Sequence, residues 1–324
     1  MSELLQSVDE RTSLAGTNRL EVLLFSLGRD MRDEREEVFG INVFKVKEVM
    51  HVPQITRAPD MPEGVEGMVS LRGETLPVIN LQAFCNIETE DKPGILIVTE
   101  YNRHLQGFLV HSVDSIKRMA WHDVKVPPPM MANRHGGLVT AVSDTDDHGL
   151  VMILDVEKVL AETAGLYEDE HLFDEITEDR QADITVLFVD DSAIARKQIE
   201  RTLKALGYKS IIAVNGQEAW TKLEKVAEEA ELAGQSVRER VQLVLTDIEM
   251  PEMDGYVLTR KIKEDSRFDG IPVVMHSSLT TESNQALGAS VGSDDYVAKF
   301  EPKALASTLR KVLLQHGFIN ESDR

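Results

Sequence analysis

The sequence predicts two domains of different fold class, an all-β domain followed by an α/β domain with a doubly wound parallel sheet. Its 324 residues are enough for two domains of ordinary size. Short apolar or alternating runs dominate the first 160 residues. From residue 184 onward, such runs alternate with segments in which apolar residues recur at helical spacing. We therefore predict domains over 1–160 and 184–324, joined by an acidic linker over 161–183.

Six runs predict the strands of the first domain. They carry β-branched residues and are bounded by clusters of Gly, Pro and Asp, which is the pattern of a sandwich or barrel. Val43, Val46 and Met50 also recur at helical spacing, so we expect a short helix after the second strand. The runs are 22–27, 38–43, 76–81, 95–98, 107–113 and 150–154.

The linker is set apart by its charge. Residues 161–183 contain nine acidic residues against the single basic residue Arg180, and their apolar periodicity is weak. This composition favours an extended, solvated chain. The alternative is a helix with four apolar residues on one side, namely Leu166, Tyr167, Leu172 and Phe173.

Five short apolar runs predict the strands of the second domain: 184–189, 210–214, 241–246, 272–277 and 295–299. The segments between and after them have helical period. Strands that alternate with helices need crossover connections, which are right-handed and place helices on both faces of a parallel sheet. We therefore expect a five-stranded, doubly wound α/β domain.

Composition and charge exclude several functions. Hydrophobic residues make up 42% and charged residues 28%, as in soluble globular proteins, and no apolar run approaches the length of a membrane helix. No secretion signal is recognisable, and the single cysteine, Cys85, agrees with a reducing compartment, so we expect a cytoplasmic protein without direct membrane insertion. The net charge of −21 repels phosphate backbones, which argues against nucleic acid as a partner.

Polar side chains stand at the carboxyl ends of four of the predicted parallel strands. Asp190 and Asp191 follow the first strand, Asp247 the third, Ser277 ends the fourth and Lys299 the fifth. An acidic pair after one strand is often only a helix cap. Polar groups at four strand ends instead indicate a site, because ligands of such sheets bind at that edge.

The chemistry of this group favours phosphoryl transfer. Carboxylates about 4 Å apart repel by about 4 kcal/mol per pair at an effective dielectric constant of 20, so three of them need a cation. Oxygen ligands suit Mg²⁺, whose coordination is often completed by substrate phosphate. A carboxylate can then act as the nucleophile, with Lys299 neutralising charge on the phosphoryl oxygens and Ser277 donating to one of them.

On these residues, the segment 184–320 resembles the receiver domain of two-component response regulators, which has the flavodoxin-like sheet order. The resemblance implies a phosphate acceptor at Asp247, which precedes Ile248-Glu249-Met250-Pro251 and Asp254-Gly255. It implies Mg²⁺ bound directly by Asp191 and Asp247, through water by Asp190, and by the backbone carbonyl of Glu249. The remaining implied roles are a catalytic lysine at Lys299 and switch residues at Ser277 and Tyr296.

Two of the departures from the receiver pattern affect the course of the backbone. Phe300 follows Lys299 where the family usually has proline, so the loop there is expected to be reshaped. The chain between Asp191 and Asp247 is longer than in compact receivers, with surplus residues around 228–240 that we expect to lengthen the second helix.

The first domain resembles CheW, the coupling protein of chemotaxis arrays. The resemblance rests on Phe39-Gly40-Ile41 and the residues up to Val49, then on Leu71-Arg72-Gly73 and the strand up to Leu81. It implies two SH3-like β-barrels whose apolar edges bind the histidine kinase CheA and the cytoplasmic tips of chemoreceptors. Arg72 is our candidate contact residue, with ordinary surface charge as the alternative. Six scattered histidines of this domain show no metal-ligand spacing.

The combination of the two domains is that of the CheV-type coupling proteins. It implies a non-enzymatic adaptor at membrane-associated receptor arrays, regulated by Mg²⁺-dependent phosphorylation of Asp247. Two alternatives stay open. The receiver could be a phosphate sink that drains the kinase and dephosphorylates itself, or it could be silent within a constitutive adaptor if Phe300 displaces Lys299.

Overall fold

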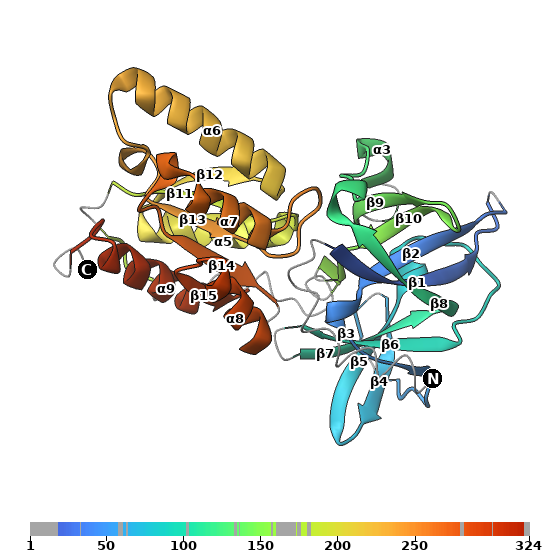
Figure 1. The fold of residues 1–324 in the computed structure, drawn as a ribbon. Helices are drawn as coiled ribbons and strands as arrows, with labels where there is room; N and C mark the ends of the chain where they lie inside the picture. Colours follow the sequence, from blue (N-terminus) through green and yellow to red (C-terminus); the bar gives the residue numbers. More distant parts are fainter. Residues whose placement is uncertain are drawn as a thin grey trace. The chain divides into compact units, whose positions relative to one another are not determined.

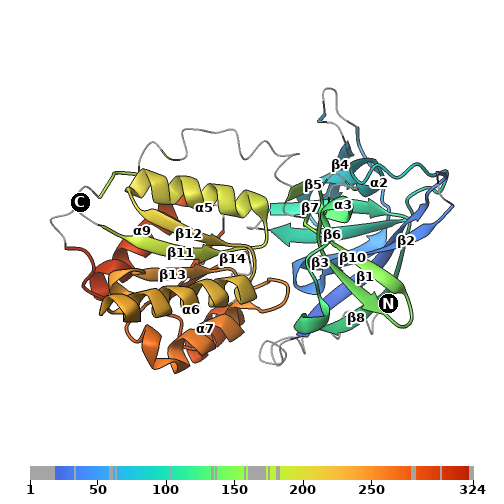
Figure 2. The ribbon, with the colours of Figure 1, turned by 90° about the horizontal axis from the view of Figure 1, so that it is seen from above.

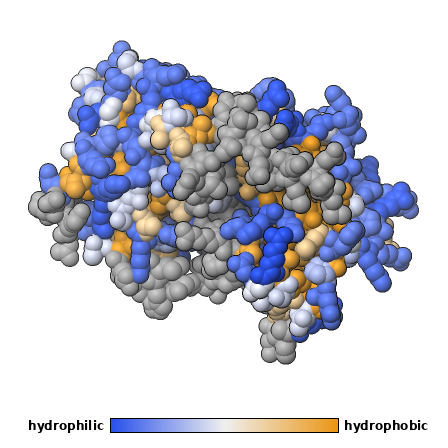
Figure 3. Space-filling view, turned by 60° about the horizontal axis from the view of Figure 1, so that its bottom comes forward, coloured by the Kyte–Doolittle hydropathy of each residue, from blue (hydrophilic) through white to orange (hydrophobic). Residues whose placement is uncertain are grey.

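The computed structural model describes residues 19–32, 34–57, 61–62, 64–101, 104–132, 135, 137–156, 158–159, 173, 176–179, 183–278, 282–299 and 301–320. The chain divides into two compact units, of which one is Leu20–Glu168 and the other includes Asp169–Arg324 (Figure 1). The first is strand-rich and the second alternates strands with helices, so the two predicted fold classes are confirmed. Hydrophilic side chains cover most of the coloured surface in Figure 3, in keeping with the net charge of −21.

The strand-rich unit contains two five-stranded sheets. The first has the order β8-β1-β2-β10-β9 and the second β3-β6-β7-β5-β4. The strands of the first sheet are β1 (Arg19–Arg29), β2 (Glu36–Asn42), β8 (Ser112–Ala120), β9 (Val139–Thr145) and β10 (Gly149–Leu154). Those of the second are β3 (Val46–His51), β4 (Val65–Leu71), β5 (Glu74–Asn80), β6 (Ile95–Tyr101) and β7 (His104–Val110).

Apolar side chains alternate between the two faces of these sheets. In β1, Leu23 and Phe25 join a cluster that also contains Ile79 and Phe108 of the second sheet. The intervening residues, such as Val22, join a separate cluster behind the first sheet. Because successive side chains of a strand point to opposite faces, β1 is apolar along almost its whole length.

Four strands of this unit do not coincide with predicted runs, namely β3, β4, β8 and β9. The short helix expected after the second strand is only a 3₁₀ turn, η2 (Val43–Lys45), so its predicted extension to Met50 is wrong. Val46 and Met50 instead lie in β3, which pairs with β6. Short helical turns connect the other strands: α2 (Leu81–Phe84), η3 (Trp121–Asp123) and α3 (Pro129–Ala132).

The α/β unit has the predicted five-stranded sheet, in the order β12-β11-β13-β14-β15, and every neighbouring pair is parallel. Its strands are β11 (Thr185–Val189), β12 (Lys209–Ala213), β13 (Leu243–Thr246), β14 (Val273–Ser277) and β15 (Asp295–Ala298). Its helices are α5 (Ala193–Leu206), α6 (Gly216–Ala233), α7 (Gly255–Glu264), α8 (Glu282–Ser290) and α9 (Pro302–Gln315).

Helices cover both faces of this sheet, as Figure 2 shows for α5 on one side and α6 and α7 on the other. Apolar residues of α5 and α9 share one cluster with the sheet, and those of α6 and α7 share another. The segment expected to lengthen the second helix, 228–240, continues α6 to Ala233. Gly234 then ends the helix in the left-handed conformation, and η5 (Val237–Glu239) follows.

Part of the predicted linker belongs to the α/β unit. Asp179 is 3% exposed, and Ile176 packs against the apolar cluster of α5 and α9. The expectation of a solvated chain is therefore wrong for these residues. Of the alternative helix, Leu166, Tyr167 and Leu172 lie outside the described residues, and Phe173 has 3₁₀ geometry.

No helix of the described ranges has both the length and the apolar character needed to cross a membrane.

Candidate functional site

The predicted site residues of the α/β unit meet at one edge of its sheet. Asp190 and Asp191 follow β11, Asp247 follows β13, Ser277 ends β14 and Lys299 follows β15. Ligand oxygens of the three aspartates lie within 4.8 Å of one another. This convergence is what parallel strands impose, because their carboxyl ends lie at a common edge.

Lys299 lies between two of the acids. Its Nζ is 2.8 Å from Asp190 Oδ2 and 2.9 Å from Asp247 Oδ2. All three side chains are almost fully buried, with relative exposures of 1%, 0% and 3% for Lys299, Asp190 and Asp247. Buried charges of this kind persist only when they are paired, so the ammonium is an integral part of the acidic site.

Backbone groups hold the second oxygen of each buried acid. Ser192 donates its N–H to Asp190 Oδ1 at 2.9 Å, and Ile248 donates its N–H to Asp247 Oδ1 at 2.7 Å. Ser192 also accepts a hydrogen bond from Ala195 N–H and so begins α5. Each carboxylate is therefore oriented by one backbone donor and one ammonium.

Arg196 was not among the predicted site residues. Its Nη1 donates to the carbonyl oxygens of Asp190 at 2.7 Å and Asp191 at 2.8 Å. This arginine ties the acidic loop to the first turn of α5. The sequence does not indicate that this arginine belongs to the site, because exposed arginines are common on helices.

His276 is a second neighbour that sequence reasoning missed. It is 3% exposed, and its Nδ1 is 3.9 Å from Asp190 Oδ2. Burial raises the pKa of Asp190, but Lys299 and then His276 lower it more strongly, and the resulting pKa is about 2. Asp190 is therefore ionised at neutral pH.

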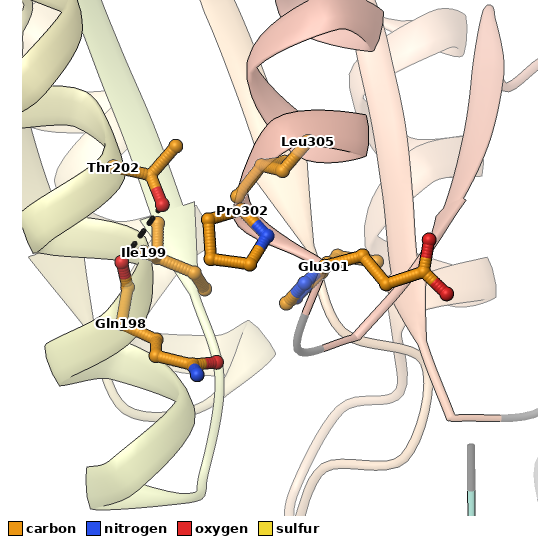
Figure 4. Close-up of a pocket in the computed structure, with 7 residues that line it drawn as sticks. Gln198, Ile199, Thr202, Glu301, Pro302 and Leu305 are labelled. Carbon is orange, nitrogen blue, oxygen red and sulfur yellow. Dashed lines mark hydrogen bonds between the residues drawn. The ribbon is translucent and has the colours of Figure 1, made fainter. Parts of the chain in front are cut away.

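A small crevice lies beside His276, between α5 and α9. Gln198, Ile199 and Thr202 line it from α5, and Glu301, Pro302 and Leu305 line it from the start of α9 (Figure 4). The Thr202 hydroxyl donates to the Gln198 carbonyl at 3.0 Å within α5 (Figure 4). The crevice therefore lies between the middle of α5 and the first turn of α9.

The donor set fits a hard divalent cation. Three carboxylates and one ammonium leave a formal charge of −2, and the ligand atoms offered are oxygens. Asp191 is only partly buried, so the group is accessible from solvent. Mg²⁺ prefers oxygen ligands and keeps several of its waters, which such a half-open group allows.

A close backbone approach positions Asp247. A Cβ atom at Gly255 would lie 2.0 Å from the Asp247 carbonyl oxygen. Asp254 caps α7 by accepting the Val257 N–H at 2.8 Å. The Asp254-Gly255 pair therefore begins α7 directly against the strand end that carries Asp247.

Ser277 and Tyr296 are connected to each other. Their side chains share a hydrogen bond, and burial raises the pKa of the Tyr296 hydroxyl above its usual range. Tyr256, which the sequence did not single out, packs with Tyr296 and Ile248 in one cluster beside the site. Burial raises its pKa in the same direction.

Glu249, two residues after Asp247, is half-buried in the turn before Met250 and Pro251. Phe300, whose replacement of proline was expected to reshape the loop, lies outside the described residues.

Arg72 lies in the other unit, at the tip of the β4–β5 hairpin. Its side chain is 76% exposed, and its Nη2 is 3.0 Å from Glu48 Oε2 on β3. The backbone of Arg72 is left-handed, with φ of 50°. Its predicted contact with a partner stays a prediction.

The model of the CheW-like domain family matches residues 21–164, and that of the response regulator receiver domain family matches residues 186–310. The chain is 31% identical to Chemotaxis protein CheV3 of Helicobacter pylori over 282 residues, which cover 86% of this chain and 89% of that protein. It is 26% identical to Chemotaxis protein CheV2 of the same organism over 328 residues, 96% of this chain and 100% of that protein.

Among solved structures, the scaffolding protein TtCheW from Thermoanaerobacter tengcongensis is similar to part of the chain. The match has 28% identity and a TM-score of 0.37 and covers 42% of this chain and 84% of that one.

Proposed function

The chain belongs to the CheV family of chemotaxis proteins, and on that premise we propose that phosphorylation of Asp247 regulates its coupling of chemoreceptors to the histidine kinase CheA. The coupling role falls to residues 1–160 and the regulatory role to residues 184–324. The protein works in the cytoplasm at membrane-associated receptor arrays. It acts as an adaptor whose receiver promotes only its own phosphorylation and dephosphorylation.

One observation carries the proposal. Lys299 contacts the acceptor Asp247 and the neighbouring Asp190 at once, within a group of acids whose net charge suits a divalent cation. An ammonium beside a nucleophilic carboxylate is placed to neutralise charge on a transferring phosphoryl group. A structural salt bridge alone would not require the third acid, Asp191.

The proposed phosphoryl transfer forms one bond to phosphorus and breaks another. An oxygen of the Asp247 carboxylate attacks the phosphorus of a phosphohistidine in the kinase. The P–N bond breaks, its electron pair goes to the histidine ring, and the ring leaves as neutral imidazole because its other nitrogen already carries a proton. In a separate step, water attacks the phosphorus of the aspartyl phosphate, the P–O bond to Asp247 breaks with its electron pair returning to the carboxylate, and inorganic phosphate leaves as the proton of the water is released.

The site residues have different proposed roles in this transfer. Asp191, Asp247 and the carbonyl of Glu249 would hold Mg²⁺, with Asp190 acting through water, and the bound ion would neutralise phosphoryl oxygens. Lys299 binds a phosphoryl oxygen directly. Ser277 donates its hydroxyl to another and so gives up its bond to Tyr296.

Incubation with Mg²⁺ and acetyl phosphate tests the acceptor. We expect a hydroxylamine-sensitive mass increase that maps to Asp247, is absent in Asp247→Asn and is abolished by EDTA. Asp254→Asn is the matched control, because Asp254 is also buried and Asn still caps α7. A mass increase in Asp247→Asn equal to that of wild type would overturn the assignment.

Coupling assays then separate regulation from the alternatives. Receptor-controlled kinase activity is measured with wild type and Asp247→Ala, each with and without acetyl phosphate. A response confined to wild type supports regulated coupling. An unchanged response, together with less phosphate reaching other regulators, would show a phosphate sink, and no phosphorylation at all would show a constitutive adaptor.

A further inference from the structure

Residues before β11 form a strap across the α/β unit. The strap consists of the described residues Phe173 and 176–179, which precede the matched receiver segment 186–310. Ile176 packs against the cluster that contains Leu203 and Leu309. The Phe173 ring lies 4.3 Å below the guanidinium of Arg201 on α5. The strap is thus bound to α5 and α9 through apolar and cation–π contacts.

Asp179 is the polar centre of the strap. The guanidinium of Arg310 on α9 donates to both of its oxygens, with Nε at 3.0 and 3.1 Å, and the Tyr208 hydroxyl donates to Oδ2. The Asp179 N–H donates to the carbonyl of Leu206, the last residue of α5, at 3.1 Å. This charge-assisted contact is largely buried, with side-chain exposures of 17% for Arg310 and 1% for Asp179, and hydrogen bonds between charged groups are stronger than neutral ones.

A third contact fixes the strap beside the end of α5. Gly207 ends α5 in the left-handed conformation, and a Cβ atom there would lie 3.0 Å from Glu178 Cγ. Arg310 also donates to the Thr177 hydroxyl at 3.2 Å. The strap therefore contacts the end of α5 and the second half of α9 over consecutive residues.

The opposite ends of these two helices adjoin the acidic site. Helix α5 begins immediately after Asp191 and Ser192, and α9 begins at Pro302, three residues after Lys299. Arg310 lies about 12 Å along α9 from Pro302 at 1.5 Å per residue. The crevice between α5 and α9 borders the middle of α5 and the first residues of α9.

We propose that the strap is released from α5 and α9 when Asp247 is phosphorylated, so that the site controls how the preceding chain is held. The inference rests on the proposed phosphorylation. A phosphoryl group competes with Asp190 for Lys299, and movement of Lys299 draws the start of α9 with it. Because a helix moves as a rigid element, the shift reaches Arg310 and weakens its geometry with Asp179.

Amide hydrogen exchange of the full chain tests the release. The protein is incubated with Mg²⁺ in the presence or absence of acetyl phosphate, and the mass at Asp247 is followed in the same samples. We expect peptides that cover 173–179 to exchange about tenfold faster with the donor, which corresponds to about 1.4 kcal/mol of local stability. Asp247→Asn should show no difference.

The outcomes distinguish the two proposals. If Asp247 gains the phosphoryl mass and exchange over 173–179 is unchanged, the strap proposal fails while the proposed function stands. If Asp247 gains no mass, both fail.

Arg310→Gln provides a second test, with Lys311→Gln as its control on the same helix because Lys311 pairs only at the surface, with Asp295. In Arg310→Gln, the strap should exchange fast without donor and change less than about twofold with it, while phosphorylation proceeds. A strap that stays slow and donor-responsive in this variant would overturn the proposal. If Arg310→Gln does not fold, the hydrogen exchange of the wild-type strap with and without acetyl phosphate still tests the proposal.

Discussion

Lys299 is the residue on which the charge balance of the acidic site depends. It is the ammonium between Asp190 and Asp247, and both acids are buried with it. Without Lys299, the buried carboxylates of Asp190 and Asp247 would lose the positive charge that compensates them. Removal of one partner of a buried charge pair costs about 3 to 5 kcal/mol, because the remaining charges are left uncompensated.

Lys299→Met should therefore lower the free energy of unfolding by about 3 kcal/mol without Mg²⁺. Added Mg²⁺ should restore part of this loss and stabilise the variant more than wild type, because the site then carries one more negative charge. Urea unfolding with and without Mg²⁺ measures both effects. Lys311→Met is the control, and equal stabilisation of Lys299→Met and wild type by Mg²⁺ would contradict the charge argument.

Glu218 provides a residue-level prediction for pH. Burial raises its pKa, but the hydrogen bonds from Lys222 and the Val214 N–H outweigh burial and lower it. A lowered pKa adds stability above the ordinary glutamate pKa of about 4.3, and this stability is lost as the pH falls through the folded value.

At neutral pH, Glu218→Gln should cost about 0.5 kcal/mol, a small figure because the side chain is 38% exposed and screened by solvent. The difference from wild type should shrink as the pH falls below the ordinary glutamate pKa of about 4.3 and vanish below the lowered folded pKa. Unfolding curves at several pH values measure it, with the exposed Glu231→Gln as control. A loss that persists at pH 3 would show that the charge is not its cause.

At the scale of elements, the first turn of α7 depends on a glycine. The space at Gly255 is closed by the Asp247 carbonyl, which is backbone and cannot move aside as a side chain could. Gly255→Ala should cost about 3 kcal/mol and displace Asp247 enough to reduce phosphorylation strongly. Val257→Ala in the same turn should cost about 1 kcal/mol and leave phosphorylation intact. Thermal unfolding and the acetyl phosphate assay test both variants, and wild-type phosphorylation of Gly255→Ala would refute the positioning argument.

The β4–β5 hairpin presents Arg72 at its tip, paired with Glu48 of β3. We expect Arg72→Ala to weaken binding of the kinase or receptor about tenfold, while the fold is unaffected because exposed ion pairs contribute little. Arg57→Ala is a close match, since Arg57 is 81% exposed and pairs with Glu66 at 3.0 Å. Binding isotherms of the full-length variants measure this effect. Equal affinities of Arg72→Ala and Arg57→Ala would indicate that Arg72 is ordinary surface charge.

Strands with apolar side chains on both faces could be predicted from the sequence. The three central strands of the α/β unit, β11, β13 and β14, are buried along almost their whole length and read as short apolar runs, whereas the edge strands β12 and β15 are only partly buried. Strand β8 was missed because it is only partly buried and carries charges such as Asp114 and Lys117. Val46 and Met50 fit a helical period by chance, and pairing of β3 with β6 overrode it.

At the scale of the whole molecule, residues that contact the α/β unit begin before the matched receiver segment 186–310. A fragment over 173–324 should unfold about 10 °C higher than one over 184–324, because the shorter fragment leaves Arg310 without Asp179. Thermal unfolding of the two fragments measures the difference. Equal midpoints would mean that the strap adds no stability.

The sequence by itself determined the two fold classes, the family and the identity of Asp190, Asp191, Asp247, Ser277 and Lys299 as a group. It could do so because parallel strands bring residues at their carboxyl ends together whatever the details of packing. Only the tertiary structure decided that Lys299 bridges Asp190 and Asp247, that His276 lies beside them, and that the end of the acidic segment binds α5 and α9. These contacts join residues far apart in the chain, and an aspartate that will be buried against an arginine has the same local sequence pattern as a solvated one.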